Sequence, residues 1–550
     1  MRHYLKGLAV AGLMAVISCQ SEPEVGNTHA VFSEAAMETY VQTLGSDEFM
    51  GRKPGTPGEA MTLAYLEEVF VELGLQPAFG NEYRQKVPMV SVTVKPEATM
   101  NISGKANDAE LQYKRDFVAF SRNLEKPLTL NASALVFAGY GIVAPEYNWN
   151  DYEGIDVKGK TVVVLVNDPG FATADPELFN GNAMTYYGRW TYKFEEAARQ
   201  GAAGLLIVHD DKGAGYPWSV VHNGAVIPKL YLSPSDGYKK RCKVEGWLTT
   251  EAAERLLETA DLDLTKLEIE AASPEFQPLE LDAQITFGMK SSFRKITSYN
   301  IGGIIEGSKH PDEVVIYSAH WDHLGVGESI DGDSIYNGAV DNGTSLAWML
   351  EIADAFTQMP QAPERSVLFL SPTAEEQGLM GAQYYVQHPA FALEKTVANI
   401  NNDLMLPYGR YKDVMVTGYG QSELEDMLSP HAKQQDRYIY PDPNPHTGMY
   451  YRADHFPFAK AGVPALFARG NCDSREHGKE WALQKEAEWL ENNYHKTTDE
   501  YEDWWDLSGT VEDAELLFSL GWELTNSRIF PQWKEGSEFK AIRHQMMNNK

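Results

Sequence analysis

The sequence predicts an α/β fold in which a mainly parallel sheet is covered by helices on both faces. Beyond residue 290, continuous apolar runs such as "EVVIYSAH" and "RSVLFLSPT" alternate with helical segments such as "GTSLAWMLEIADAFTQ". Continuous apolar strands indicate burial on both faces, and their alternation with helices indicates parallel pairing. Several of the strands also end in His, Asp or Glu, at the sheet edge where sites collect in such folds.

The pattern changes twice along the chain. Residues from about 30 to 90 predict helices, with an apolar stripe in "GEAMTLAYLEEVFVELGL" that ends at Gly74. From about Ala134, short β runs and turns predominate. Since 550 residues are too many for one ordinary domain, we predict one domain formed by residues 31–110 and 290–545, interrupted by a β-rich insert of residues 111–289.

The first residues predict a processing signal. Arg2 and Lys6 precede the apolar run "GLAVAGLMAVI", which is too short to span a bilayer. The segment 16–19, "VISC", resembles a bacterial lipobox, so we predict a lipoprotein signal peptide over residues 1–18, lipidation of Cys19 and a polar tether over 19–30. Gln20 favours the outer membrane, facing the periplasm or the cell surface, and no other segment is apolar enough to span a membrane. An ordinary signal peptide with a chance cysteine is the alternative.

Composition excludes some classes of function. The formal charge is −31, from 47 basic and 78 acidic residues, which argues against nucleic-acid binding. Besides Cys19, the chain has Cys242 and Cys472, whose pairing the sequence leaves open, and no zinc-finger spacing.

The strand ends and loops after residue 318 supply a set of polar residues in a definite order: His320, Asp322, Asp341, Glu375, Glu376, Asp403 and His495. A spacing of two in extended chain places His320 and Asp322 on one side of their strand. Each pattern alone has a simpler interpretation, such as a helix cap or a charged loop. Together, two histidines and several carboxylates without a thiolate favour two divalent ions such as zinc.

In this order the motifs resemble those of the M28 family of di-zinc peptidases, which includes aminopeptidases and glutamate carboxypeptidases. The motifs are "SAHWDHLG", "IYNGAVDNGTS", "TAEEQGLMGAQYY", "NINNDL", "YRADHFPFAKAGVPAL" and "YHKTTDEY". The resemblance covers most of residues 290–505, and "KGKTVVVLV" with "KFEEAARQGAAGLLIVHDD" resembles a protease-associated (PA) domain. It implies the zinc-peptidase fold, a three-layer mainly parallel or mixed sheet flanked by helices, with an inserted PA domain.

The resemblance implies two zinc ions per chain and a role for each residue of the set. Asp341 would bridge the ions, with His320 and Asp403 at one and Glu376 and His495 at the other.

Two further residues would act in catalysis. Glu375 would be the general base, and Asp322 would orient the first histidine. Because relatives often have a cis peptide after the bridging aspartate, we expect the bond between Asp341 and Asn342 to be cis.

The implied activity is that of a zinc-dependent exopeptidase, an aminopeptidase in which Glu375 deprotonates a water held between the ions. A carboxypeptidase or dipeptidase of the glutamate-carboxypeptidase type stays open, and Arg452 and Arg469 could then bind a substrate carboxylate. A glutaminyl cyclase and a non-catalytic receptor are more distant alternatives. The expected partners are peptide substrates and, through the lipid anchor only, a membrane; the oligomeric state is left open.

Other residues have weaker assignments. Tyr494, Asp454 and His455 are candidates for substrate binding, with core packing the alternative for Tyr494. His323 is expected to pack beside the site or support a ligand rather than bind metal.

Overall fold

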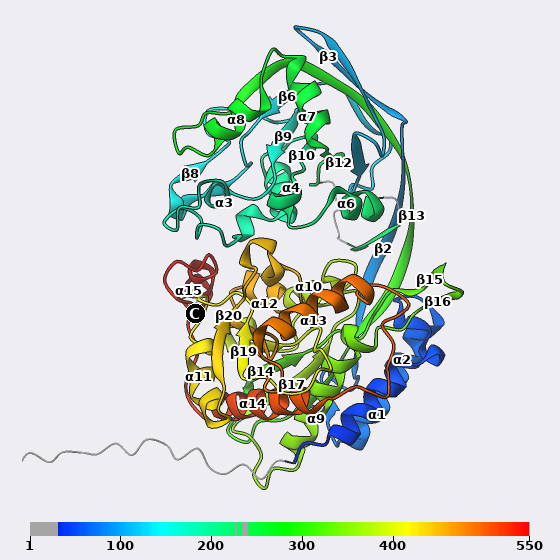
Figure 1. The fold of residues 1–550 in the computed structure, drawn as a ribbon, viewed down its shortest axis with the longest axis vertical. Coiled ribbons are helices and arrows are strands. Elements are labelled where there is room, and N and C mark those ends of the chain that lie inside the picture. Colours follow the sequence, from blue (N-terminus) through cyan, green and yellow to red (C-terminus); the bar gives the residue numbers. More distant parts are fainter. Residues whose placement is uncertain (1–30, 226–227, 234–239, 549–550) are drawn as a thin grey trace, which may run out of the picture.

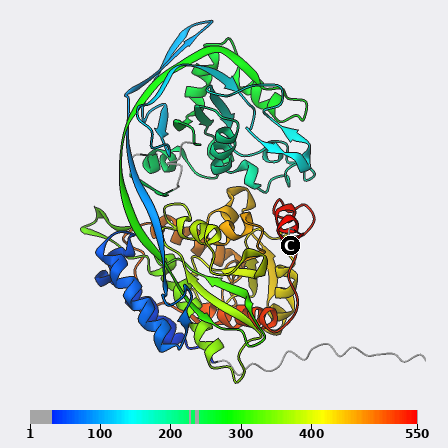
Figure 2. The same cartoon turned by 180° about the vertical axis from the view of Figure 1, so that it is seen from behind.

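The structure, a computed structural model, describes residues 31–225, 228–233 and 240–548. Two lobes are stacked along the long axis and joined by two long antiparallel strands, β2 (Arg84–Pro96) and β13 (Leu279–Ile305) (Figure 1). The upper lobe is the part of the chain between these strands, and the lower lobe is the rest. Seen from behind, the β2–β13 ribbon follows one side of the molecule (Figure 2). The predicted signal peptide, the tether and Cys19 lie outside the described residues.

The lower lobe is built on a mixed sheet. Its strands, in spatial order from the end of β13, are β17 (Arg365–Ser371), β14 (His310–Ser318), β18 (Thr396–Asn401), β21 (Ala465–Arg469), β19 (Asp413–Val416) and β20 (Tyr438–Pro441). The four strands from β17 to β21 run parallel, whereas β13 and β19 pair antiparallel at either side of them. The short β1 (Gln76–Pro77) also pairs with β13.

Helices cover both faces of this sheet. Along β14, Val315 and Tyr317 face a core shared with α1, α9 and α14, whereas Val314 and Ile316 face the core on the opposite side, with α10 and α12. The lower-lobe helices are α1 (Glu34–Leu44), α2 (Pro57–Glu72), α9 (Ser345–Thr357), α10 (Met380–Gln387), α11 (Leu424–Gln434), α12 (His455–Lys460), α13 (Gly478–Asn492), α14 (Ser508–Thr525) and α15 (Lys540–Asn548). The predicted α/β class, with a mainly parallel or mixed sheet between helices, is confirmed.

The helical prediction for residues 30–90 is wrong beyond α2. Residues 84–96 form β2, in which Val87 and Met89 are buried in one apolar cluster and Val90 and Val92 in another. The spacing of two within each pair is the strand period, and pairing with β13 supplies the hydrogen bonds that a helix would otherwise form internally.

The upper lobe has its own sheet, in which β6, β9, β10 and β12 run parallel and β5, β13 and β3 pair antiparallel. Its strands are β3 (Thr99–Gly104), β4 (Asp108–Gln112), β5 (Phe117–Phe120), β6 (Leu128–Phe137), β7 (Val143–Ala144), β8 (Trp149–Asn150), β9 (Thr161–Leu165), β10 (Gly204–Val208), β11 (Lys229–Leu232) and β12 (Val244–Leu248). Its helices are α3 (Pro169–Thr173), α4 (Trp190–Arg199), α5 (Asp211–Ala214), α6 (Trp218–Ala225), α7 (Thr250–Glu258) and α8 (Leu264–Ala271). The predicted domain limits at 110 and 290 fall inside β4 and β13.

The lobes also touch away from the ribbon. Tyr451 donates its hydroxyl to the carbonyl oxygen of Met184 (3.1 Å), and Lys460 pairs with Glu195 (2.8 Å). The upper lobe is therefore held on the lower lobe by side-chain contacts as well as by the ribbon.

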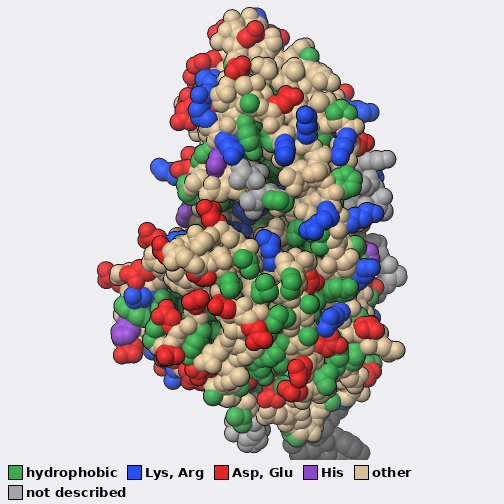
Figure 3. Space-filling model, turned by 90° about the vertical axis from the view of Figure 1, so that its right-hand side faces the viewer, with side chains coloured by type: hydrophobic (Ala, Val, Ile, Leu, Met, Phe, Trp, Pro, Cys, Tyr) green, Lys and Arg blue, Asp and Glu red, His purple; other side chains and the backbone are tan. Residues whose placement is uncertain are grey.

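On one face of the molecule the acidic side chains are dispersed. In the face shown in Figure 3, Asp and Glu side chains on the lower lobe are interspersed with hydrophobic and basic ones. Among the described helices, none is both long and apolar enough to cross a membrane.

Candidate metal centre

The predicted site residues meet at one edge of the lower-lobe sheet. His320 and Asp322 follow β14, Glu375 and Glu376 follow β17, and Asp403 follows β18. These strands are parallel neighbours, so their carboxyl ends lie side by side. Two loops complete the set: Asp341 lies in the short π-helical turn η4 (Ala339–Thr344) before α9, and His495 follows α13.

One group of ligand atoms surrounds His320. Its Nε2 lies 3.4 Å from Oδ1 of Asp341 and 3.4 Å from Oδ1 of Asp403. Neither this Nε2 nor the Asp403 Oδ1 has a hydrogen-bond partner among the described residues, although both are buried. At 3.4 Å the two atoms are close enough to bind one ion.

A second group surrounds His495. Its Nε2 lies 3.4 Å from Oδ2 of Asp341 and 3.0 Å from Oε2 of Glu376. Asp341 thus presents one oxygen to each histidine, which is the arrangement expected of a carboxylate shared by two ions. The peptide bond between Asp341 and Asn342 is cis, as expected from the family resemblance.

These separations fit a bound metal. Zinc holds nitrogen and oxygen ligands at about 2.0–2.2 Å in a tetrahedral arrangement, which places two ligand atoms roughly 3.3 Å apart. The distances of 3.0–3.4 Å around both histidines match this spacing. Imidazole and carboxylate donors without a thiolate suit zinc or a similar divalent ion.

Asp322 supports the site in a way that the sequence did not predict. We expected its carboxylate to orient His320, but the Nδ1 of His320 lies 3.0 Å from the backbone oxygen of Asp322 and 3.9 Å from its carboxylate. Because a carbonyl oxygen can only accept, Nδ1 carries the hydrogen and Nε2 keeps a lone pair for a metal. The carboxylate of Asp322 accepts from the backbone N–H of Glu375 instead (3.0 Å).

Glu375 and Glu376 are adjacent, but their surroundings differ. Burial raises the pKa of Glu375 well above its usual range, and Asp403 adds to the rise while His320 opposes it. For Glu376, burial and Asp341 also act upward, but His495 and His323 outweigh them and lower its pKa. In the absence of metal, Glu376 is therefore the better ligand and Glu375 the more readily protonated group.

His323 is placed beside a ligand. Its Nδ1 lies 2.6 Å from Oε1 of Glu376, whereas it is 4.0 Å from Oδ1 of Asp341. The shorter distance is that of a hydrogen bond and is too short for two ligands of one tetrahedral ion. His323 therefore orients Glu376, while His495 lies at ligand spacing from both carboxylates.

The three candidates for substrate binding are all packed near the centre. The ring of Tyr494 stacks on His495, with centroids 3.9 Å apart. His455 lies against the rings of Tyr450 and Phe467, with centroids 4.6 Å and 5.3 Å away.

The remaining candidate, Asp454, is 1% exposed. Burial and the nearby Asp322 and Asp403 raise its pKa to about 8, although His320 acts against them. Neither of its carboxylate oxygens has a hydrogen-bond partner among the described residues.

Two supporting residues could not be identified from the sequence. Arg52 lies in the N-terminal segment beneath the site, and Asp499 accepts from the backbone N–H groups of Val340 and Asp341 (2.9 and 3.0 Å). Asp499 lies four residues after His495, but no spacing rule relates it to the Asp341 loop. Arg52 is more than 250 residues from the Trp321 and Asn337 carbonyls that it contacts, and its sequence context carries no metal-ligand pattern.

Cys242 and Cys472 are both buried free thiols, so they do not pair with each other.

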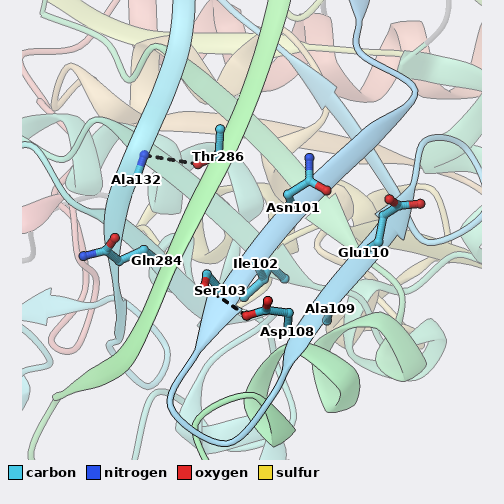
Figure 4. Close-up of a pocket in the computed structure, with 9 residues that line it drawn as sticks. All are labelled: Asn101, Ile102, Ser103, Asp108, Ala109, Glu110, Ala132, Gln284 and Thr286. Atoms are coloured by element: carbon cyan, nitrogen blue, oxygen red, sulfur yellow. Dashed lines mark hydrogen bonds between the residues drawn. The ribbon is translucent and has the colours of Figure 1, made fainter.

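A polar depression of about 390 Å³ lies in the upper lobe, between β3, β4, β6 and β13 (Figure 4). Asp108 accepts from Ser103 there (2.9 Å), and Thr286 accepts from the N–H of Ala132 (3.2 Å). These polar groups pair within the protein, and none of the predicted site residues lines the depression.

Comparison with known proteins agrees with the motifs. The profile described as "Peptidase family M28" matches residues 300–518. Mouse "Aminopeptidase NAALADL1" is 32% identical over 139 residues, which are 24% of this chain and 17% of the mouse protein. "Carboxypeptidase Q" of Xenopus laevis is 30% identical over 275 residues, 50% of this chain and 47% of the frog protein. The matched segments thus span less than half of either relative.

Among solved structures, "Aminopeptidase from Aneurinibacillus sp. strain AM-1" resembles this chain with a TM-score of 0.49 and 16% identity, over 91% of this chain and 95% of that one. The profile match includes β14, β17, β18 and β21, and it contains every residue that the structure brings to the two histidines. Residues 300–518 of this chain are therefore a domain of peptidase family M28.

Proposed function

We propose that this protein is a zinc-dependent exopeptidase, and specifically an aminopeptidase. The observation that carries the proposal is the position of Asp341, whose two oxygens each lie 3.4 Å from the Nε2 of a different histidine. A shared carboxylate between two such groups fits a pair of ions better than a single one.

The residues that would hold each ion follow from these distances. His320 and Asp403 would share one ion with Asp341, and His495 and Glu376 would share the other with it. Two divalent ions there supply a Lewis acid that polarises the scissile carbonyl and acidifies water.

Glu375 is the residue that moves the proton. Its Oε2 lies 3.8 Å from Nε2 of His320, beside the ligands but outside their 3.0–3.4 Å spacing. Nearby dications would counter the burial that raises its pKa, so the carboxylate is ionised when substrate binds. It then takes the proton of the attacking water on a carboxylate oxygen and returns it to the leaving amine.

A carboxypeptidase is the second candidate, and one observation favours it. Arg469 ends β21, whose neighbour β18 leads directly to Asp403. Arg469 is 5% exposed, and the Nε and Nη1 of its guanidinium have no hydrogen-bond partner among the described residues. A cation near the centre could hold the carboxylate at the C-terminus of a substrate.

A panel of substrates with free and blocked termini decides between the two. We expect hydrolysis of aminoacyl anilides with a free amine, loss of this activity with a chelator, and its return with zinc. Cleavage of N-acylated peptides from the C-terminus, without hydrolysis of the anilides, would replace the aminopeptidase with the carboxypeptidase. Less than two zinc ions per active chain would contradict the shared role of Asp341.

Two further proposals concern the rest of the chain. The upper lobe acts as an inserted PA-type domain that limits access of substrates to the centre, and Cys19 carries a lipid that anchors the protein in a bacterial envelope. The test of the second is partition into the membrane fraction, which the substitution Cys19→Ser abolishes.

A further inference from the structure

We propose that Arg52 is a positioning residue for the metal centre, one that holds the backbone of the His320 and Asp341 loops at ligand spacing. The inference rests on the proposed metal centre but not on the identity of the substrate. Arg52 is fully buried and belongs to a short helical turn, η1 (Asp47–Arg52), that precedes α2.

Every donor of the guanidinium is used on a backbone carbonyl. Nε donates to Trp321 (2.9 Å), Nη1 to Leu44 and Asn337 (both 2.6 Å), and Nη2 to Gly338 (2.8 Å) and Asp341 (3.3 Å). An arginine has five N–H groups, so none is left over.

These carbonyls belong to the loops that carry ligands. Trp321 lies between His320 and Asp322, so one bond fixes the loop that follows β14. The Asn337, Gly338 and Asp341 carbonyls surround the turn that presents the shared carboxylate. One rigid, planar group therefore sets the distance between the two loops, which must meet at 3.4 Å.

Asp499 holds the same turn by accepting hydrogen bonds from the backbone N–H groups of the turn. Its two oxygens accept from the N–H of Val340 and of Asp341, and its backbone oxygen accepts from the N–H of Ala339 (3.0 Å). The turn thus lies between a cation, which donates hydrogen bonds to its carbonyl oxygens, and an anion, which accepts hydrogen bonds from its N–H groups. Asp499 also ties the turn to His495, which precedes it by four residues.

The charge of Arg52 matters as well as its shape. The buried centre gathers Asp322, Asp341, Glu375, Glu376 and Asp403. A permanent cation beneath them offsets part of their repulsion before any metal binds. Burial lowers the pKa of Arg52, and Asp499 and Asp341 act in the opposite direction.

The backbone of this segment is unusual. Met50, Gly51 and Arg52 all have positive φ, of 50°, 62° and 51°. A side chain on Gly51 would meet the carbonyl oxygen of Tyr336 at 2.3 Å. A left-handed run of this kind costs free energy, and here it directs the guanidinium under the site.

The test measures zinc binding as well as peptidase activity. In Arg52→Lys, a lysine keeps the charge but offers only three donors without the planar fork. We expect zinc affinity of the metal-free protein to fall by roughly 10–100-fold, as for other groups that orient ligands. The absorption spectrum of the cobalt(II)-loaded protein should change, and kcat should fall while KM stays close to wild type.

A matched control is Arg543→Lys. Arg543 is also a buried arginine that donates to two backbone carbonyls, of Leu393 and Thr396 (2.9 and 3.0 Å), but Thr396 starts β18 at the end remote from Asp403. Its replacement should lower the melting temperature without changing zinc affinity or the cobalt spectrum.

Asp499→Asn serves as a second variant, because an amide leaves one of the two N–H groups without an acceptor. It should weaken zinc binding like the lysine variant. If Arg52→Lys does not fold, it tests whether the backbone of the Asp341 turn must be held in place for zinc to bind. Folded variants with wild-type zinc affinity and cobalt spectrum would overturn the inference. A wild-type protein that binds no zinc would instead contradict the proposed function.

Discussion

Both lobes have parallel strands that end in polar residues, but the two sets of strand ends behave differently. In the upper lobe, Asp168 after β9, Asp210 after β10 and Thr249 after β12 each accept from a backbone N–H at the start of the next helix. These are helix caps, which satisfy groups that the helix leaves free.

In the lower lobe, Asp403 after β18 and Asp341 in the η4 turn face a histidine instead. Asp341 and Asp403 lie 3.4 Å from His320 without forming hydrogen bonds to it. The same signature, an aspartate after a buried strand, thus marks a cap in one lobe and a candidate ligand, Asp403, in the other. Buried atoms that lie 3.4 Å from each other and have no hydrogen-bond partner among the described residues are what separate the two.

The largest difference between the lobes should appear when an aspartate is removed from each. Asp341→Ala should lose both ions and reduce peptidase activity to background, because each of its oxygens serves one histidine. Asp210→Ala, the matched change at a helix cap, should keep both ions and the peptidase activity. Metal analysis of the purified proteins after gel filtration measures this, and a zinc-loaded Asp341→Ala protein would remove the distinction.

The next effect separates the proposed base from the proposed ligands within the lower lobe. Glu375→Gln should lower kcat by about 10²–10⁴-fold, since an amide cannot accept the proton, while zinc content stays unchanged. Steady-state kinetics with parallel metal analysis checks both parts. Activity equal to wild type at full zinc loading would show that another group takes the proton.

A smaller effect is expected for the residue that orients one ligand. His323→Leu removes the hydrogen bond to Glu376 and should weaken the ion at His495 by roughly 10–100-fold, with little effect on the ion at His320. Zinc titration of the metal-free protein would show two classes of site where wild type is more uniform. Equal weakening of both ions would contradict the separate supports described above.

The smallest effect concerns a cap in the upper lobe. Thr249→Ala removes the acceptor for the N–H of Ala252 and should lower the free energy of unfolding by about 1 kcal/mol. Activity and zinc content should not change, and Thr249→Ser should restore the stability. Thermal or urea unfolding measures the difference, and a loss of zinc would show that the lobes are coupled more tightly than this comparison implies.

The sequence by itself predicted the α/β class and nominated the residues that meet at the sheet edge. It could do so because strand burial and strand-end chemistry are local patterns, and because parallel strands carry their ends to one edge. It failed over residues 84–96, where β2 is stabilised by a partner strand about two hundred residues away.

Only the tertiary structure decided which atoms form the hydrogen bonds that support the site. The backbone oxygen of Asp322, rather than its carboxylate, holds His320, and Arg52 reaches the Trp321 and Asp341 carbonyls from the far end of the chain. Such contacts join residues with no fixed spacing and use backbone groups that every residue shares. A pattern of side chains therefore cannot encode them, whereas the packed fold places them within hydrogen-bonding distance.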